Sequence, residues 1–277
     1  MYAERSNAYF LILNNKLYKK EINDGSLELW IDGGFGWNQH TSLIYSEKLN
    51  RILTIVGTNK LAFIDPKYKE IEFEMRLGFA DYIMTLKFFG NNGQSVLFVT
   101  QNRYVGIIEY DISFKKAQLL TKLRYSGSED EHGIGADIDF NNKVIMVTNF
   151  VDRGSKSSRI VALELLANND LIQTASLRVE GGSRWMQAFR MAKSYNTHTL
   201  FVGVDSGEGG SAHTYWYDSV NKLISRDVQK MVPHQERFVW GLERQGDWFY
   251  YTGNEGKLMR VKQFELGNSV LQQDNSY

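Results

Sequence analysis

The sequence contains no cysteine and only two prolines among its 277 residues. Without cysteine, the chain can form neither a disulfide nor a thiolate metal site, and it offers no cysteine nucleophile. Lys and Arg together number 32, and so do Asp and Glu, which makes the formal net charge zero. Binding to nucleic acid or to an anionic membrane depends on excess positive charge. We therefore expect neither kind of partner.

Long apolar runs are also missing. No run approaches the roughly 20 residues that a membrane helix requires. The first seven residues, MYAERSN, lack the basic segment followed by an apolar segment that marks a signal peptide. From these features we predict a soluble, monomeric protein of the cytoplasm.

What the chain does contain is a repeated pair of short β-strands. In the clearest example, residues 51–57 and 59–65 form two runs rich in β-branched and aromatic residues, joined by a short polar turn. The same pair of strands is predicted again from Ala8, Ser95, Lys143, Thr199 and Asp247. Repeats of roughly 40–50 residues are typical of propellers and arrays.

Six units of about four strands each predict an all-β fold, namely a six-bladed β-propeller with four-stranded antiparallel blades. We expect a single domain over residues 1–277. The first unit shows strands at 8–13, 16–22 and 27–31 but no obvious innermost strand, which the tail after Leu266 could supply. The ring would then close with strands from both termini, and closure removes exposed strand edges. A count of five or seven blades stays open if the ends are misjudged.

One segment resembles a repeat of a known family. Residues 133–149, GIGADIDFNNKVIMVTN, are similar to repeats of the NHL and gluconolactonase-like (SMP-30) six-bladed propellers. The resemblance lies in repeat length and strand rhythm, and it implies the propeller fold. The Glu-Gly-Pro opening of the lactonases is absent, so that family's calcium ligands are not carried over.

In a propeller, one face carries both the linkers between units and the turns between the second and third strands of each unit. This chain has long segments at those positions, and loops longer than their scaffold requires tend to carry function. The linkers are residues 32–40, 78–81, 126–132, 180–185 and 233–237, and the long turns are 149–156 and 205–211.

Three of the five histidines precede the innermost strands of alternate units. They are His40, His132 and His234, and eleven positions separate both His40 from Arg51 and His132 from Lys143. Alternate blades are related by about a third of a turn, so three imidazoles would converge on the mouth of the central tunnel. Three histidines with an open fourth position are typical of a catalytic divalent metal. The alternative is that they line the tunnel as ordinary polar side chains.

Carboxylates lie in the same class of linkers as these histidines, at 78–81, 126–132 and 233–237. An acid close to the metal can hold a ligating histidine in its orientation, or it can act as general base on the metal-bound water. The candidates for catalysis are Asp81, Glu131 and Glu236.

Two tryptophans also fall on the loop-rich face, next to polar residues. An indole ring beside acidic and amide groups suits a sugar ring or another flat polar ligand. The alternative is that tryptophan fills the gap between neighbouring blades. The predicted ligand-binding residues are Trp37, Trp185, Asp32, Asn38, Glu180 and Arg184.

Together these patterns predict a site for a small molecule, such as a carbohydrate, at the tunnel mouth. The metal would make the protein a lyase or hydrolase. The alternative is a non-catalytic scaffold that binds a protein partner, because propellers host many functions.

Overall fold

We analysed a computed structural model, which describes residues 1–35, 43–151, 157–180, 188–204, 212–229, 239–245, 248–253 and 258–262. These residues form antiparallel strands and one short 3-10 helix, η1 (Glu4–Ser6), which confirms the all-β class. Within these ranges there is no helix that is long and apolar enough to cross a membrane.

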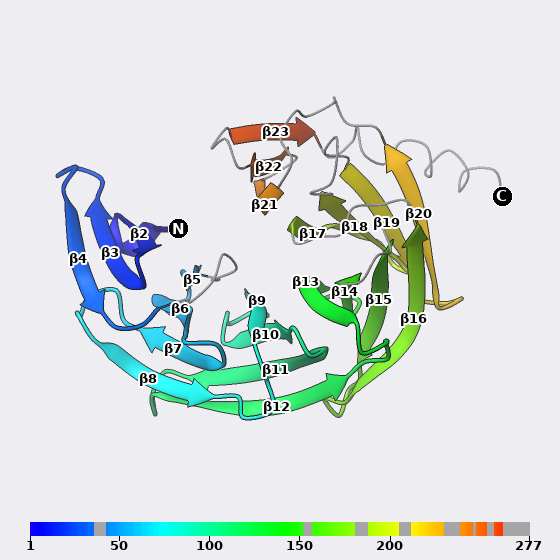
Figure 1. Ribbon diagram of the computed structural model, residues 1–277, viewed down its shortest axis with the longest axis horizontal. Coiled ribbons are helices and arrows are strands. Elements are labelled where there is room, and N and C mark those ends of the chain that lie inside the picture. Colours follow the sequence, from blue (N-terminus) through cyan, green and yellow to red (C-terminus); the bar gives the residue numbers. More distant parts are fainter. Residues whose placement is uncertain are drawn as a thin grey trace. The chain divides into compact units, whose positions relative to one another are not determined.

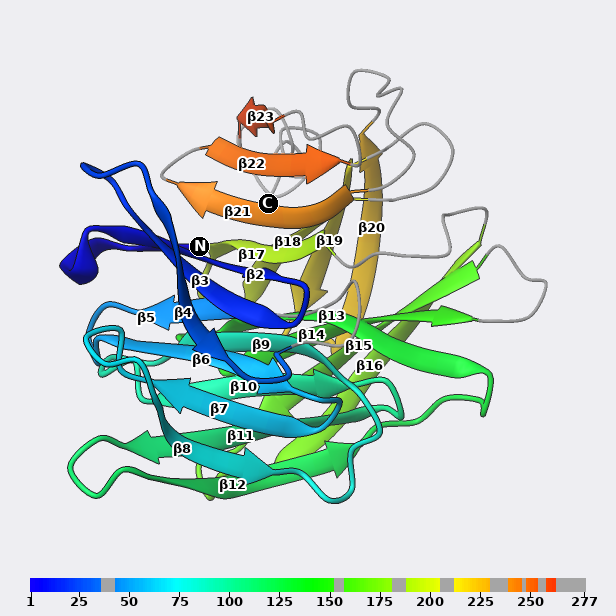
Figure 2. The same cartoon turned by 60° about the vertical axis from the view of Figure 1, so that its left-hand side comes forward.

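The strands form six sheets, and each sheet is built from strands that are consecutive in the sequence (Figures 1 and 2). Five sheets have four strands, and the sixth has three in the described part of the chain. Backbone contacts divide the chain into two compact units, Met1–Arg124 and Tyr125–Tyr277, which are described separately below. The single domain over residues 1–277 stays a prediction.

The first unit holds three four-stranded sheets. Its first hairpin turns at Asn14 and Asn15, which both have positive φ, the backbone that a two-residue hairpin requires. The strands are β1 (Tyr2–Ala3), β2 (Ala8–Leu13), β3 (Lys16–Glu21), β4 (Leu27–Asp32), β5 (Leu43–Ser46), β6 (Arg51–Val56), β7 (Lys60–Ile64), β8 (Ile71–Arg76), β9 (Ile83–Phe89), β10 (Ser95–Thr100), β11 (Tyr104–Asp111) and β12 (Lys116–Arg124).

The second unit holds the other three sheets. Its strands are β13 (Glu131–Asp139), β14 (Val144–Val151), β15 (Ser157–Leu165), β16 (Leu171–Glu180), β17 (Ala188–Ser194), β18 (His198–Val204), β19 (Ala212–Asp218), β20 (Leu223–Gln229), β21 (Val239–Gln245), β22 (Trp248–Gly253) and β23 (Leu258–Lys262).

Two expectations about strands need correction. The first sheet does have a strand before β2, because Tyr2 and Ala3 pair with Tyr9 and Ala8. Two residues are too short to show the alternation by which a strand is recognised in sequence. The first strand of the fourth sheet begins at Glu131, within the stretch 126–132 that was expected to be a linker, so Glu131 and His132 lie in β13. The tail after Leu266 lies outside the described residues.

Apolar side chains between consecutive sheets hold each unit together. In the first unit, Phe10 and Leu17 of the first sheet pack with Ile52 of the second, and Phe63 of the second packs with Phe98 of the third. In the second unit, buried residues of the fourth and fifth sheets form one cluster that includes Val144, Met146, Phe189 and Phe201.

A repeated polar contact joins neighbouring sheets. The Tyr110 hydroxyl donates to Glu72 at 2.8 Å, and the Tyr217 hydroxyl donates to Glu164 at 2.8 Å. Five residues after each tyrosine a lysine pairs with the same glutamate, Lys115 with Glu72 and Lys222 with Glu164. We call this contact the Tyr–Glu clamp. It joins the second and third sheets in one unit, and the fourth and fifth in the other.

Candidate functional site

The linkers and turns at one end of the sheets are joined by hydrogen bonds in the first unit. The Leu77 amide donates to the Asn59 carbonyl at 2.9 Å, and the Asn59 side chain donates to the Ala80 carbonyl at 3.0 Å. The Ile83 amide donates to the Thr58 carbonyl at 2.9 Å. Linker and turn therefore lie at the same end, which we call the loop end.

Asp81 is part of this linker. One oxygen of its carboxylate accepts hydrogen bonds from the amides of Tyr82 at 2.6 Å and Asn102 at 3.0 Å. The Asn102 side chain in turn donates to the Phe79 carbonyl at 2.8 Å. The described contacts of Asp81 thus hold the linker against the turn between β10 and β11.

Two cations lie over aromatic rings beside this linker. The Lys122 ammonium lies 4.4 Å from the Phe79 ring centre, and the Arg124 guanidinium lies 6.0 Å from that of Tyr104. Lys122 and Arg124 are two residues apart on β12 and therefore project to the same face. The sequence analysis missed this group, although two cations at strand spacing were a visible signal.

A buried polar network lies in the second unit, at the end of the fourth sheet where β14 ends and β15 begins, which by strand order is the loop end of that sheet. The Glu131 carboxylate forms an ion pair with the Arg159 guanidinium at 2.8 Å and accepts from the Asn149 amide at 3.4 Å. The Tyr125 hydroxyl donates to the Asn149 side-chain oxygen at 2.7 Å. Glu131, Asn149 and Tyr125 are buried, whereas 27% of the Arg159 side chain is exposed. We call these four residues the Glu131 network.

The strand register explains how these residues meet. Asn149 lies opposite Gly133 on one side and opposite Arg159 on the other, so the three residues share one face of the sheet. The pairing of β13 with β14 shifts between Gly133 and Gly135, where the Gly135 amide donates to the Thr148 hydroxyl at 3.0 Å. Such bulges redirect side chains and occur often beside functional sites. Arg178 lies opposite Arg159 in β16, which puts a second guanidinium on this face.

His132 projects away from this network. It follows Glu131 in the strand, and successive strand residues point to opposite faces. Its ring lies 5.0 Å from the ring of Phe150, the residue opposite it in β14. The structure therefore separates the predicted metal ligand from the predicted acid next to it in sequence.

The remaining predicted residues are placed only in part. Asp32 is exposed at the end of β4 and pairs with Lys16 at 2.8 Å. Glu180 is the last residue of β16, and its backbone pairs with Ser157. The others lie outside the described residues: Trp37, Asn38, His40, Arg184, Trp185, His234 and Glu236.

No three described His, Asp or Glu side chains are grouped as a metal site would require. His132 is the described member of the predicted trio, so the fit of the three histidines to a metal stays a prediction.

The Glu131 network includes three residues that the sequence analysis did not select. Tyr125, Asn149 and Arg159 lie far from one another in sequence, and no local motif links them. Asn149 alone carried a signal, because it is an amide side chain within a strand of mostly apolar residues.

Comparison with models of known protein families finds no match, and comparison with curated proteins finds no significant relative.

Proposed function

We propose that the six sheets are the blades of a six-bladed β-propeller whose loop end binds a small polar organic ligand. The blade assignment is supported by the six consecutive antiparallel sheets and by the shared position of linkers and turns in the first unit. Ring closure is supported by the first sheet, where one face leaves Tyr9, Leu13, Leu27 and Leu29 more than 40% exposed. A closing blade would cover these apolar side chains.

The observation that carries the ligand proposal is the ion pair between Glu131 and Arg159. Burying a charge pair adds little to stability, because desolvation offsets the attraction. A buried carboxylate that holds a partly exposed guanidinium does, however, fix that guanidinium in position. Guanidinium groups bind carboxylates and phosphates through paired N–H donors. The ligand therefore carries an anionic group that contacts Arg159, and Glu131 is a positioning residue.

A ligand screen tests this proposal. Saturation-transfer NMR on the full chain would use three probe classes: neutral methyl hexosides, hexuronates, and small dicarboxylates. We expect at least one anionic probe to bind, and Arg159→Gln to weaken it about tenfold or more. Arg5→Gln removes an exposed arginine of η1 and serves as the control, with unchanged affinity. Binding by none of the anionic probes, or equal binding by Arg159→Gln, would refute the proposal.

The three-histidine metal centre is a separate part of the proposal, and it rests on the spacing of His40, His132 and His234. A divalent metal there would polarise a carbonyl or activate water for lyase or hydrolase chemistry. Asp81 and Glu236 remain the candidate bases. Elemental analysis of the purified chain tests it. We expect one divalent metal per chain, lost in His132→Ala and retained in His198→Ala, which changes a histidine outside the trio. Metal content at background in the wild type, or unchanged in His132→Ala, would contradict it.

A protein-interaction scaffold is the second candidate function. The exposed face of the first sheet favours it, because its apolar side chains, which lie beside Lys16 and Lys20, suit a protein partner as well as a closing blade. The two uses differ in their effect on stability, and a substitution of Leu29, described in the Discussion, separates them.

A further inference from the structure

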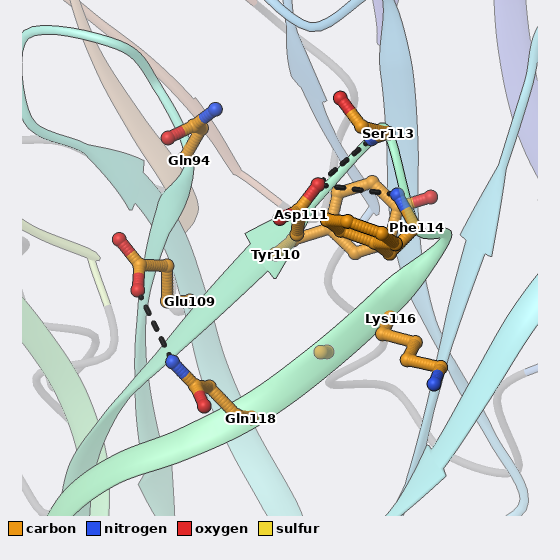
Figure 3. A pocket seen from close by; sticks show the side chains of 9 residues that line it. Gln94, Glu109, Tyr110, Asp111, Ser113, Phe114, Lys116 and Gln118 are labelled. Atoms are coloured by element: carbon orange, nitrogen blue, oxygen red, sulfur yellow. Dashed lines mark hydrogen bonds between the residues drawn. The ribbon is translucent and has the colours of Figure 1, made fainter.

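A pocket of about 520 Å³ lies on the third sheet, at the hairpin between β11 and β12 (Figure 3). Ligand pockets typically measure roughly 300–1,000 Å³. β11 begins at Tyr104, beside the linker of the loop end, and ends at Asp111 in the pocket. The pocket therefore lies at the other end of this sheet from the linkers. It is lined by Gln94, Glu109, Tyr110, Asp111, Ser113, Phe114, Lys116, Ala117 and Gln118.

Two cross-strand pairs supply its polar groups. Glu109 lies opposite Gln118, and Asp111 lies opposite Lys116, so the four side chains share one face of the hairpin. The Gln118 amide donates to the Glu109 carboxylate at 3.4 Å, a long bond that a better-placed donor could replace. Gln94, the residue just before β10, also lines the pocket (Figure 3).

The hairpin turn presents an aromatic ring at the pocket. One oxygen of the Asp111 carboxylate accepts from the amides of Ser113 at 2.8 Å and Phe114 at 3.2 Å. These bonds fix the turn, which leaves Phe114 73% exposed. A single exposed apolar residue is ordinary on a protein surface. Here the Asp111 bond fixes the backbone of Phe114, and the residue lines the pocket together with several polar side chains.

The opposite face of β11 makes the wall of the pocket rigid. Tyr110 is buried, its ring stacks on Phe63 at 4.2 Å, and its hydroxyl belongs to the Tyr–Glu clamp. Sites built on strands whose reverse face is well packed hold their geometry better than sites on loops. The strand that carries Glu109 and Asp111 is therefore held in place by the packing of its reverse face.

We infer that this pocket binds a saccharide, at a site distinct from the loop end. Sugar hydroxyls both donate and accept hydrogen bonds. Glu109 and Asp111 are acceptors, Lys116 is a donor, and Gln94 and Gln118 are both. The Phe114 ring offers an apolar surface for the C–H face of a sugar ring. A phosphate or other anion fits less well, because two carboxylates face one ammonium group. An apolar peptide would leave these polar groups without partners.

Saturation-transfer NMR on the full chain tests the inference with methyl glycosides of the common hexoses and with their disaccharides. We expect millimolar binding of at least one of these probes, with Phe114→Ala and Gln118→Ala each about tenfold weaker. Phe114 is exposed, so its substitution leaves the fold intact. Tyr68→Ala, which changes an exposed aromatic residue in the corresponding turn of the second sheet, is the matched control with wild-type binding.

Three results would overturn the inference: no saccharide binds the wild type, Phe114→Ala binds as the wild type does, or Tyr68→Ala loses binding equally. Arg159→Gln separates this site from the loop end. A neutral saccharide bound at the hairpin keeps its affinity in that variant. A saccharide whose binding depends on Arg159 and not on Phe114 places the ligand elsewhere and contradicts the inference.

Discussion

At the scale of single residues, close packing around one glycine determines what β11 can accept. A Cβ atom added at Gly106 would lie 2.5 Å from the Phe98 ring and 2.5 Å from the Thr121 carbonyl oxygen. The carbonyl belongs to the backbone of the neighbouring strand, so it has little freedom to move. Only glycine fits here, next to the shift in register between Ile107 and Ile108.

We expect Gly106→Ala to lower the free energy of unfolding by about 1–3 kcal/mol, the usual cost of overpacking a core. Gly78→Ala is the control, since a Cβ at Gly78 meets nothing within 4 Å. That variant should remain within about 0.5 kcal/mol of the wild type. Urea denaturation measures both, and equal stability of the two variants would show that the strands separate to admit the methyl group.

At the scale of elements, the Tyr–Glu clamp holds pairs of sheets together through one hydroxyl each. Tyr110→Phe removes the donor to Glu72 and keeps the ring on Phe63. We expect a loss of about 1–3 kcal/mol in the free energy of unfolding, because the acceptor is charged. Tyr68→Phe, at a half-exposed tyrosine outside the clamp, should change stability by no more than about 0.5 kcal/mol. A Tyr110→Phe variant as stable as this control would mean that the hydroxyl of the clamp does not contribute.

The clamp also predicts a dependence on alkaline pH. Burial, together with the hydrogen bond to Glu72, raises the pKa of Tyr110, and burial likewise raises the pKa of Tyr217 beside Glu164. An unfolded tyrosine has a pKa of about 10. The folded state favours the protonated phenol, so this contribution is complete below about pH 10 and is lost as the pH rises through the folded pKa.

Denaturant titrations at neutral and at alkaline pH measure the effect. All 15 tyrosines titrate in the unfolded chain, so the comparison must be with the double variant Tyr110→Phe, Tyr217→Phe. We expect the wild type to lose more stability above about pH 10 than the double variant does. Parallel losses would show that the two buried phenols are not the source.

Several of these elements were predictable from sequence, and others were not. The runs at 51–57 and 143–147 predict β6 and β14, because apolar, mostly β-branched residues there continue along a buried strand. The two residues of β1 carry no such pattern. Glu131 and His132 look like linker residues, since polar side chains open a strand that becomes apolar only at Ile134. The Glu131 network depends on strand register across β13, β14 and β15, which a single sequence does not encode locally.

At the scale of the whole molecule, a substitution on the exposed face of the first sheet tests whether another sheet of the chain or a protein partner covers that face. Leu29 shares this face with Tyr9 and Leu27, because the three residues follow the same alternation across β2, β3 and β4. If the chain closes over the face, Leu29→Lys loses about 1–3 kcal/mol by burying a charge and removing apolar contact.

The control for this substitution is Leu223→Lys, at a leucine 62% exposed at the start of β20. It should cost no more than about 0.5 kcal/mol. Thermal and urea unfolding measure both variants. A Leu29→Lys variant that is as stable as Leu223→Lys would contradict ring closure and favour the protein-interaction scaffold.

We propose that the loop end binds an anionic ligand through Arg159, which Glu131 holds in place. The most direct test of this claim is a double-mutant cycle of ligand affinity with Glu131→Gln, Arg159→Gln and the double variant, using the anionic probe found by screening. If Glu131 acts through Arg159, each single substitution weakens binding, and the double variant binds as Arg159→Gln does. Fully additive losses, or wild-type affinity in Arg159→Gln, would contradict the claim.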